Sequence, residues 1–78
     1  MNSMKLDEAA GYLESAVNIN PNFTFALYNL GIVYYNRNKG EDLKAAKKMF
    51  TKILEIEPKN SNFYKLASDA LAQVESKK

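Results

Sequence analysis

The sequence predicts an all-α fold of about four helices, arranged as antiparallel helix-turn-helix repeats. Apolar residues recur at helical spacing along most of the 78 residues. Pro21 and Pro58 interrupt this pattern 37 residues apart, and the same frame, Ala-x3-[Leu/Phe]-x2-[Ala/Ile]-x4-Pro, precedes each of them. A fixed period between about 20 and 50 residues is typical of stacked helical units.

The first helix is expected at about residues 4–18. Its apolar residues fall within a stripe roughly 120° wide at 100° per residue, and polar residues cover the opposite side. Pro21 then ends the helical run, because proline lacks an amide donor and biases Asn20 away from helix. Asn22 is positioned to cap a second helix at about residues 23–36.

A polar connector at residues 36–40 follows the second helix. Gly40 tolerates a left-handed turn there. The third helix is expected at about residues 41–57, with Glu41 and Asp42 in its first turn, where the helix dipole favours negative charge.

The fourth helix is expected at about residues 62–75. Pro58 stops the third helix, and either Asn60 or Ser61 can cap the fourth. Because the loops between neighbouring helices are short, the sequence predicts antiparallel helix hairpins.

A second motif, Leu-x2-Leu-Gly-x2-Tyr, lies between the two proline-ended frames. The residues of the combined pattern are Leu27, Leu30, Gly31, Tyr34, Ala46, Phe50, Ile53 and Pro58. On these residues the chain resembles the tetratricopeptide repeat family. The resemblance implies that the chain is a fragment of a right-handed solenoid. Members of this family bind other proteins.

The resemblance also implies how a single domain of residues 1–78 is divided. Residues 4–19 would be the second helix of a partial repeat, residues 24–60 a full repeat with about three residues more than the family's 34, and residues 61–76 a third-repeat first helix or a capping helix. Within the full repeat, Gly31 has no side chain, so the third helix can approach the second closely there.

Composition argues against catalysis and metal binding. The chain contains no histidine and no cysteine, so the usual zinc and copper ligands, a thiol nucleophile and the usual neutral-pH base are missing. The acidic residues fall on predicted outward faces or at helix ends, where carboxylates keep ordinary pKa values and make poor acid–base catalysts. We therefore expect no enzyme, no metal site and no cofactor.

Nothing in the sequence resembles a membrane segment or a leader. No apolar run approaches the roughly 18 residues that span a bilayer, and the first residues lack the apolar stretch of a signal peptide. The default expectation is a soluble, cytoplasmic protein with no membrane partner.

The second predicted helix is unusual because only Asn29 and Asn36 interrupt its apolar surface. The resemblance implies that the first helix of each repeat lines a concave groove. The groove residues expected on this basis are Phe25, Tyr28, Asn29, Ile32 and Asn36 on the second helix and Asn62, Lys65, Asp69 and Gln73 on the fourth. Such a groove suits an extended or helical peptide. The alternative remains that the aromatic residues pack against neighbouring helices and that the four polar residues form a solvated face.

Binding of chaperone C-termini is disfavoured. Family members that hold the C-terminal carboxylates of chaperones use paired lysine, asparagine and arginine side chains. Only Asn29 matches that set, because Asn62 and Leu66 stand where the resemblance implies a lysine and an arginine.

A basic stripe on the third helix argues only weakly for a nucleic-acid partner. The stripe consists of Lys44, Lys47, Lys48 and Lys52. Glu55 interrupts it, and no aromatic residue is interleaved for base stacking. We interpret the stripe as a solvated convex face.

Two functional hypotheses remain. The first is a module that binds a protein or peptide ligand in the groove. The second is a structural element that forms a homo-oligomer or belongs to a longer scaffold, because helix one has no partner helix before it and Leu13 and Val17 would be partly uncovered.

Overall fold

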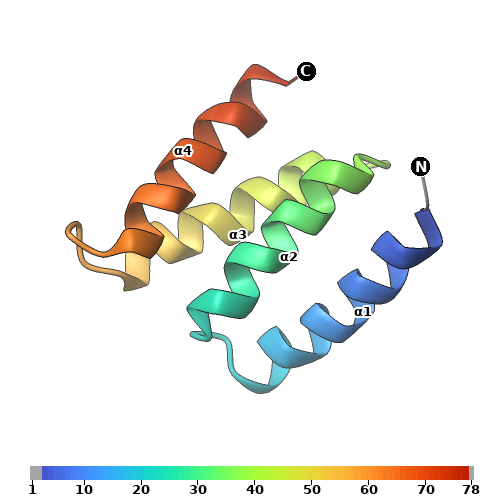
Figure 1. The fold of residues 1–78 in the computed structure, drawn as a ribbon, viewed down its shortest axis with the longest axis horizontal. Coiled ribbons are helices and arrows are strands. Elements are labelled where there is room, and N and C mark those ends of the chain that lie inside the picture. The colour runs from blue at the N-terminus through green and yellow to red at the C-terminus, as the bar shows by residue number, and fades with distance from the viewer. Residues whose placement is uncertain (1–2, 78) are drawn as a thin grey trace.

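The computed structural model, which describes residues 3–77, contains four α-helices and no strand within that range. The helices are α1 (Ser3–Ile19), α2 (Thr24–Arg37), α3 (Asp42–Ile56) and α4 (Asn62–Ser76). Figure 1 shows them as successive antiparallel hairpins. The all-α prediction is confirmed, and each helix begins and ends within one residue of its expected position.

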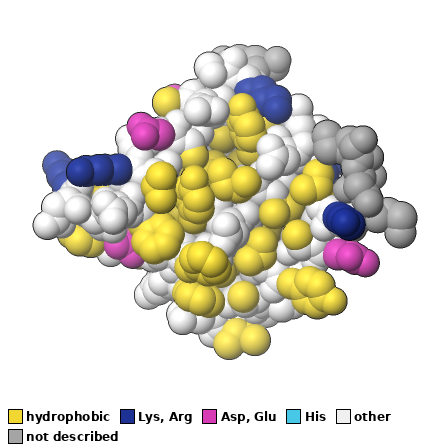
Figure 2. All heavy atoms as spheres, in the orientation of Figure 1, with side chains coloured by type: hydrophobic (Ala, Val, Ile, Leu, Met, Phe, Trp, Pro, Cys, Tyr) yellow, Lys and Arg dark blue, Asp and Glu magenta, His cyan; other side chains and the backbone are white. Residues whose placement is uncertain are grey.

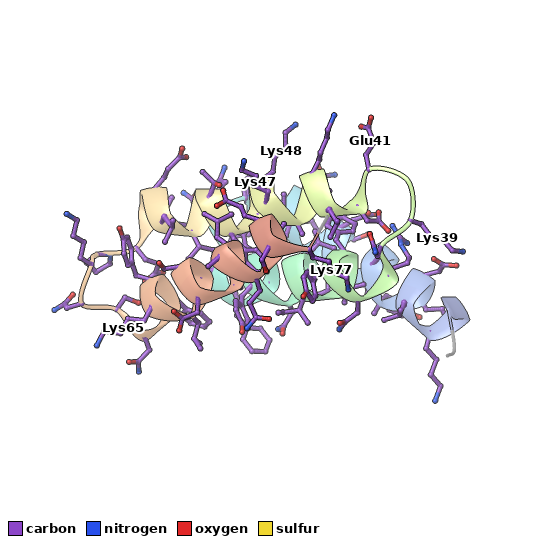
Figure 3. All side chains as sticks on the ribbon, turned by 90° about the horizontal axis from the view of Figure 1, so that it is seen from above. Lys39, Glu41, Lys47, Lys48, Lys65 and Lys77 are labelled. Atoms are coloured by element: carbon purple, nitrogen blue, oxygen red, sulfur yellow. The ribbon has the colours of Figure 1, made fainter. Side chains whose placement is uncertain are left out.

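Helix α2 lies at the centre of the arrangement and packs against α1, α3 and α4, while α3 also packs against α4. The molecule is a slab with extents of 35 × 30 × 17 Å. In Figure 1, α3 passes behind α2 and α4. Seen from above, Lys47 and Lys48 of α3 point away from the other helices, and Lys65 lies on the opposite side (Figure 3). The slab therefore has one face covered by α3 and another on which α2 and α4 are exposed.

The hydrophobic core lies where α2, α3 and α4 meet. Its buried members are Leu27, Ala46, Phe50, Ile53, Ala67 and Val74. Most of the repeat pattern lies in this core or beside it: Leu30 and Gly31 are also buried, Tyr34 is half-buried, and Pro58 is exposed in the turn after α3. Burial of the aliphatic and aromatic members supplies the main stabilising term.

At Gly31, α2 packs directly against a side chain of α3. A Cβ atom on Gly31 would lie 2.6 Å from Cε1 and 2.7 Å from Cζ of Phe50. The close approach predicted at Gly31 is confirmed, and the atoms that occupy the space are those of the Phe50 ring.

The cap predicted for α2 is wrong. The N-cap residue is Phe23, which makes no side-chain cap hydrogen bond. The Phe23 amide donates to the carbonyl of Asn20 at 3.0 Å, and the Asn22 amide donates to Oδ1 of Asn20 at 3.3 Å. This tight turn holds Asn22 one residue before the cap position, so its side chain does not serve the helix.

The other two turns follow the sequence more closely. Ser61 is the N-cap of α4, and its Oγ accepts a hydrogen bond from the Phe63 amide at 3.1 Å. In the connector between α2 and α3, Gly40 is left-handed with φ of 54°, as expected. Asn38 is left-handed as well, with φ of 48°, a conformation that asparagine tolerates better than most residues.

Arg37, at the end of α2, joins three helices. Its guanidinium donates two hydrogen bonds to the Asp42 carboxylate, at 2.8 and 3.0 Å, and one to Asp7 of α1 at 2.9 Å. It also lies over the Tyr34 ring, 5.6 Å from the centroid. Fork geometry of this kind matches arginine to a carboxylate.

The expectation that every carboxylate is exposed and keeps an ordinary pKa is wrong for Asp42 and Glu57. Asp42 is only 8% exposed, because α3 begins against Arg37. Hydrogen bonds from Arg37 hold the pKa of Asp42 below its usual value despite burial. Hydrogen bonds from Thr24 and then Ser61 lower the pKa of Glu57.

Glu57 connects helix ends at the opposite end of α3 from Arg37. Thr24 Oγ1, at the start of α2, donates to one carboxylate oxygen at 2.6 Å. Ser61 Oγ, before α4, donates to the other at 2.8 Å. A single side chain after α3 thus joins the beginnings of α2 and α4.

Candidate functional site

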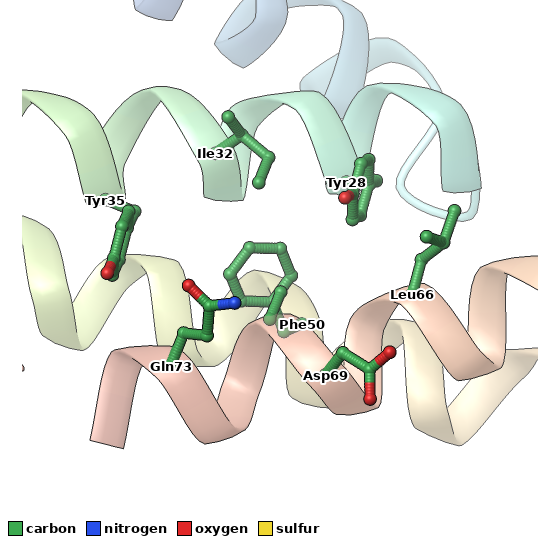
Figure 4. Close-up of a pocket in the computed structure, with 8 residues that line it drawn as sticks. Tyr28, Ile32, Tyr35, Phe50, Leu66, Asp69 and Gln73 are labelled. Atoms are coloured by element: carbon green, nitrogen blue, oxygen red, sulfur yellow. The ribbon is translucent and has the colours of Figure 1, made fainter. Parts of the chain in front are cut away.

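A pocket of about 260 Å³ lies between α2 and α4, with α3 beneath it. It is lined by Tyr28, Ile32, Tyr35, Phe50, Leu66, Asp69, Ala70 and Gln73. Figure 4 shows the α2 residues on one side, the α4 residues on the other and Phe50 between them. The fully buried Phe50 ring forms the floor, so the pocket is continuous with the hydrophobic core.

Helical spacing places the two walls opposite each other. Tyr28, Ile32 and Tyr35 are related by steps of four and three, which puts them on one face of α2. Leu66, Asp69, Ala70 and Gln73 have the same spacing on α4. Each wall spans eight residues, and the seven steps between its first and last residue correspond to about 10 Å of helix at 1.5 Å per residue.

Aromatic contacts hold the wall formed by α2 in place. The Tyr28 ring lies 5.9 Å from Phe50 and 6.3 Å from Phe63, in both cases tilted, which is within the range that aromatic pairs favour. At the other end of the pocket, the Lys77 ammonium lies over the Tyr35 ring at 4.3 Å from the centroid. Both tyrosine rings are therefore positioned before any ligand enters.

The α4 wall combines an exposed apolar side chain with two polar ones. Leu66 is 45% exposed at one end. In Figure 4 the Gln73 amide points into the pocket, and the Asp69 carboxylate lies at the rim near Leu66. Among residues 3–77, the side chains of Asp69 and Gln73 make no hydrogen bond or ion pair. The pocket thus offers an apolar floor with polar groups available at its edge, a combination typical of binding sites.

The pocket brings together four of the nine predicted groove residues: Tyr28, Ile32, Asp69 and Gln73. The other five, Phe25, Asn29, Asn36, Asn62 and Lys65, do not line it. Phe25 is 58% exposed and lies beside Phe23, with 6.2 Å between ring centroids.

Sequence reasoning missed Leu66 and Ala70 as pocket residues, left Tyr35 open between packing and the groove, and treated Phe50 only as a packing residue. For Leu66 the sequence does contain a signal, because it lies three and seven residues before Asp69 and Gln73 on the same helical stripe. Tyr35 both packs and lines the pocket, since it is half-buried beneath Lys77.

The face that carries the pocket is largely apolar. Figure 2 shows hydrophobic side chains gathered over the middle of this face, with charged side chains toward its margins. None of the four lysines of the α3 stripe lines the pocket, and Lys47 and Lys48 point away from the other helices (Figure 3). Lys44 and Lys47 are exposed, as predicted, and approach Glu41 at 4.0 Å and Glu75 at 3.5 Å.

The part of the chain that the structure describes lacks two further kinds of feature. No helix within residues 3–77 has the length and apolar character needed to cross a bilayer. The same residues contain no group of three or more acidic, histidine or cysteine side chains that could hold a metal ion.

The chain matches no family model, no curated protein and no solved structure. The resemblance to tetratricopeptide repeats therefore stays a prediction from sequence, and the candidate site depends on its own geometry.

Proposed function

We propose that the chain is a non-catalytic, tetratricopeptide-like interaction module that binds a protein or peptide segment in the groove between α2 and α4. The observation that supports this most directly is the α2–α4 pocket, in which apolar walls and a partly exposed Leu66 surround a floor of core residues. Exposed apolar surface of this kind, rimmed by polar residues, commonly marks an interaction site.

The size of the pocket favours side chains of a polypeptide over a whole small molecule. Its volume of about 260 Å³ lies below the roughly 300–1,000 Å³ of small-molecule sites. One or two apolar side chains would each contribute about 1.5–3 kcal/mol on burial. Two such side chains give at most about 6 kcal/mol, so even before the cost of association is subtracted their burial supports a Kd no tighter than about 40 μM.

Leu66→Asp is the variant that tests this proposal. Leu66 is exposed, so the substitution leaves the core intact while placing a charge at the pocket. Ile19→Asp is the matched control, because it adds the same charge at an apolar side chain that is 85% exposed on α1. Circular dichroism should show the same helix content for both variants and the parent.

The measurement is a selection of displayed random peptides on the parent chain, followed by titration of the enriched peptides. We expect the parent and Ile19→Asp to bind them with equal Kd, and Leu66→Asp at least 10-fold more weakly. Equal binding by Leu66→Asp would place the ligand elsewhere and refute the proposal.

Self-association is a second candidate. Exposed Tyr12 and Ile19 on α1, and the adjacent Phe23 and Phe25 before and within α2, favour it. Light scattering across a concentration series distinguishes the two functions. A tight dimer that hides the Tyr28 and Leu66 side chains would replace the free groove, whereas a monomer at high concentration would refute self-association.

A further inference from the structure

One carboxylate, that of Asp69, lies at the end of the groove formed by Tyr28 and Leu66. Of the eight side chains that line the pocket, Asp69 is the only charged one. Two cations flank the groove without lining it: Lys65 lies one turn earlier on α4, and the Lys77 ammonium lies over the Tyr35 ring, at the end away from Asp69, where it keeps its charge. A ligand seated beside Leu66 would therefore meet an apolar surface with one carboxylate at its edge.

The backbone of the groove restricts the conformation of its occupant. Both walls are interior turns of helices, whose amides and carbonyls are already hydrogen-bonded within α2 and α4. An extended peptide would find few backbone partners here and would leave its own polar groups unpaired as it lost water. A helical peptide satisfies its own backbone and presents only side chains.

The length of the groove sets the spacing of the side chains it can take. About 10 Å of wall holds two apolar side chains at positions i and i+4 of a helix, which lie about 6 Å apart along its axis. One would lie between Tyr28 and Leu66, and the other over Phe50 near Ile32 and Gln73.

On these grounds we propose that the occupant of the groove is a basic amphipathic helix. Two apolar side chains at i and i+4 fill the pocket, and a lysine or arginine next to them pairs with the Asp69 carboxylate. This inference depends on the proposed function and adds the chemical class of the ligand. Helix-in-groove binding with a flanking charge is a common mode of recognition, and the charge contributes to specificity more than to affinity.

The test uses a library of alanine-based helical peptides as its probe. Leucine, methionine or phenylalanine occupies i and i+4, and the flanking positions are randomised among lysine, glutamate and glutamine. The library is selected on the parent chain, on Asp69→Lys and on Glu55→Gln. Glu55 is an exposed carboxylate of α3 that does not line the pocket, so Glu55→Gln is the control for a change of charge elsewhere on the surface.

We expect the parent and Glu55→Gln to enrich lysine over glutamate beside the apolar pair, and Asp69→Lys to reverse this preference. Because an exposed ion pair is weak, the lysine peptide should bind the parent roughly 2- to 5-fold more tightly than its glutamate counterpart. One outcome refutes the inference but leaves the proposed function standing. In it, the parent enriches peptides that Leu66→Asp no longer binds, but lysine and glutamate peptides bind equally well to the parent and to Asp69→Lys.

Two further outcomes would overturn the inference. If the parent enriches no peptide relative to Leu66→Asp, the proposed function fails with it. If the parent is a dimer that Leu66→Asp dissociates, a second copy of the chain occupies the groove instead.

Discussion

A single methyl group at Gly31 should destabilise the fold, although alanine is the better helix former. Gly31 lies inside α2, where replacement of glycine by alanine usually stabilises by about 1 kcal/mol. Here the added Cβ would lie 2.6 and 2.7 Å from two ring atoms of Phe50. Two opposing effects of known size therefore act at one position.

The steric effect should be the larger. The Phe50 ring is fully buried, so it cannot move away without disturbing the rest of the core. Overpacking of this kind costs about 1–3 kcal/mol. With the gain in helix propensity subtracted, Gly31→Ala should lower the free energy of unfolding by about 1 kcal/mol, which corresponds to a fall in Tm of roughly 4–8 °C.

A double-mutant cycle separates the two effects. Phe50→Leu removes the two ring atoms nearest the new methyl group, so Gly31→Ala in that background should stabilise by about 1 kcal/mol. Gly11→Ala on α1 is the control for propensity alone, because a Cβ there meets nothing within 4 Å. Urea and thermal unfolding followed by circular dichroism give all the required free energies.

Two results would refute this reasoning. One is a Gly31→Ala protein at least as stable as the parent. The other is additivity of the Gly31 and Phe50 changes to within about 0.5 kcal/mol, which is the behaviour of sites that do not touch.

Two further predictions concern pH. The pKa of Asp42 is lowered in the folded state, so its contribution is present above the unfolded value of 3.8 and is lost as pH falls; Asp42→Asn should cost about 1–3 kcal/mol at pH 7, and a difference that did not shrink in acid unfolding curves would contradict this. Burial, and second the hydrogen bond that the Tyr34 hydroxyl donates to Glu14, raise the pKa of Tyr34 from 10.0 to about 12. The contribution of the protonated hydroxyl to the free energy of unfolding is therefore present below pH 10 and is lost as pH rises to 12. Tyr34→Phe should cost about 1 kcal/mol at pH 7, and alkaline unfolding curves should show a smaller loss across that interval than in the parent.

The helices could be predicted to within one residue because their limits are set locally. Pro21 and Pro58 end helical runs, and Ser61 caps the helix that begins next to it. The failure at Asn22 has a local cause too, since the preceding turn decides whether a good capping residue reaches the cap position.

The polar contacts could not be predicted because their partners are distant in sequence. Thr24 and Glu57 are separated by 33 residues, and Arg37 and Asp7 by 30. Nothing near Asp42 in the sequence marks it as buried, since its burial depends on where the end of α2 lies against α3.

The sequence predicts which residues of the candidate site share a helix face, but not how deeply each of them is buried. Periodicity puts Tyr28 and Ile32 on one stripe and Asp69 and Gln73 on another, and the pocket joins these four. Whether Leu66 would be covered or exposed depended on the distance between α2 and α4, which the packing of Phe50 beneath them determines.

The Glu57 carboxylate fixes the distance between α2 and α4 at one end of the groove, the end near Tyr28, and leaves the other end free to open. Opening the Tyr28 end would break the hydrogen bond to Glu57 from Thr24 or the one from Ser61, and both are strengthened by the charge on Glu57. At the other end the structure places Lys77 over Tyr35, a surface contact that long, mobile side chains can exchange for others. A bulky ligand should therefore increase the separation of α2 and α4 at the Tyr35 end of the groove. Their separation at the Tyr28 end should stay constant.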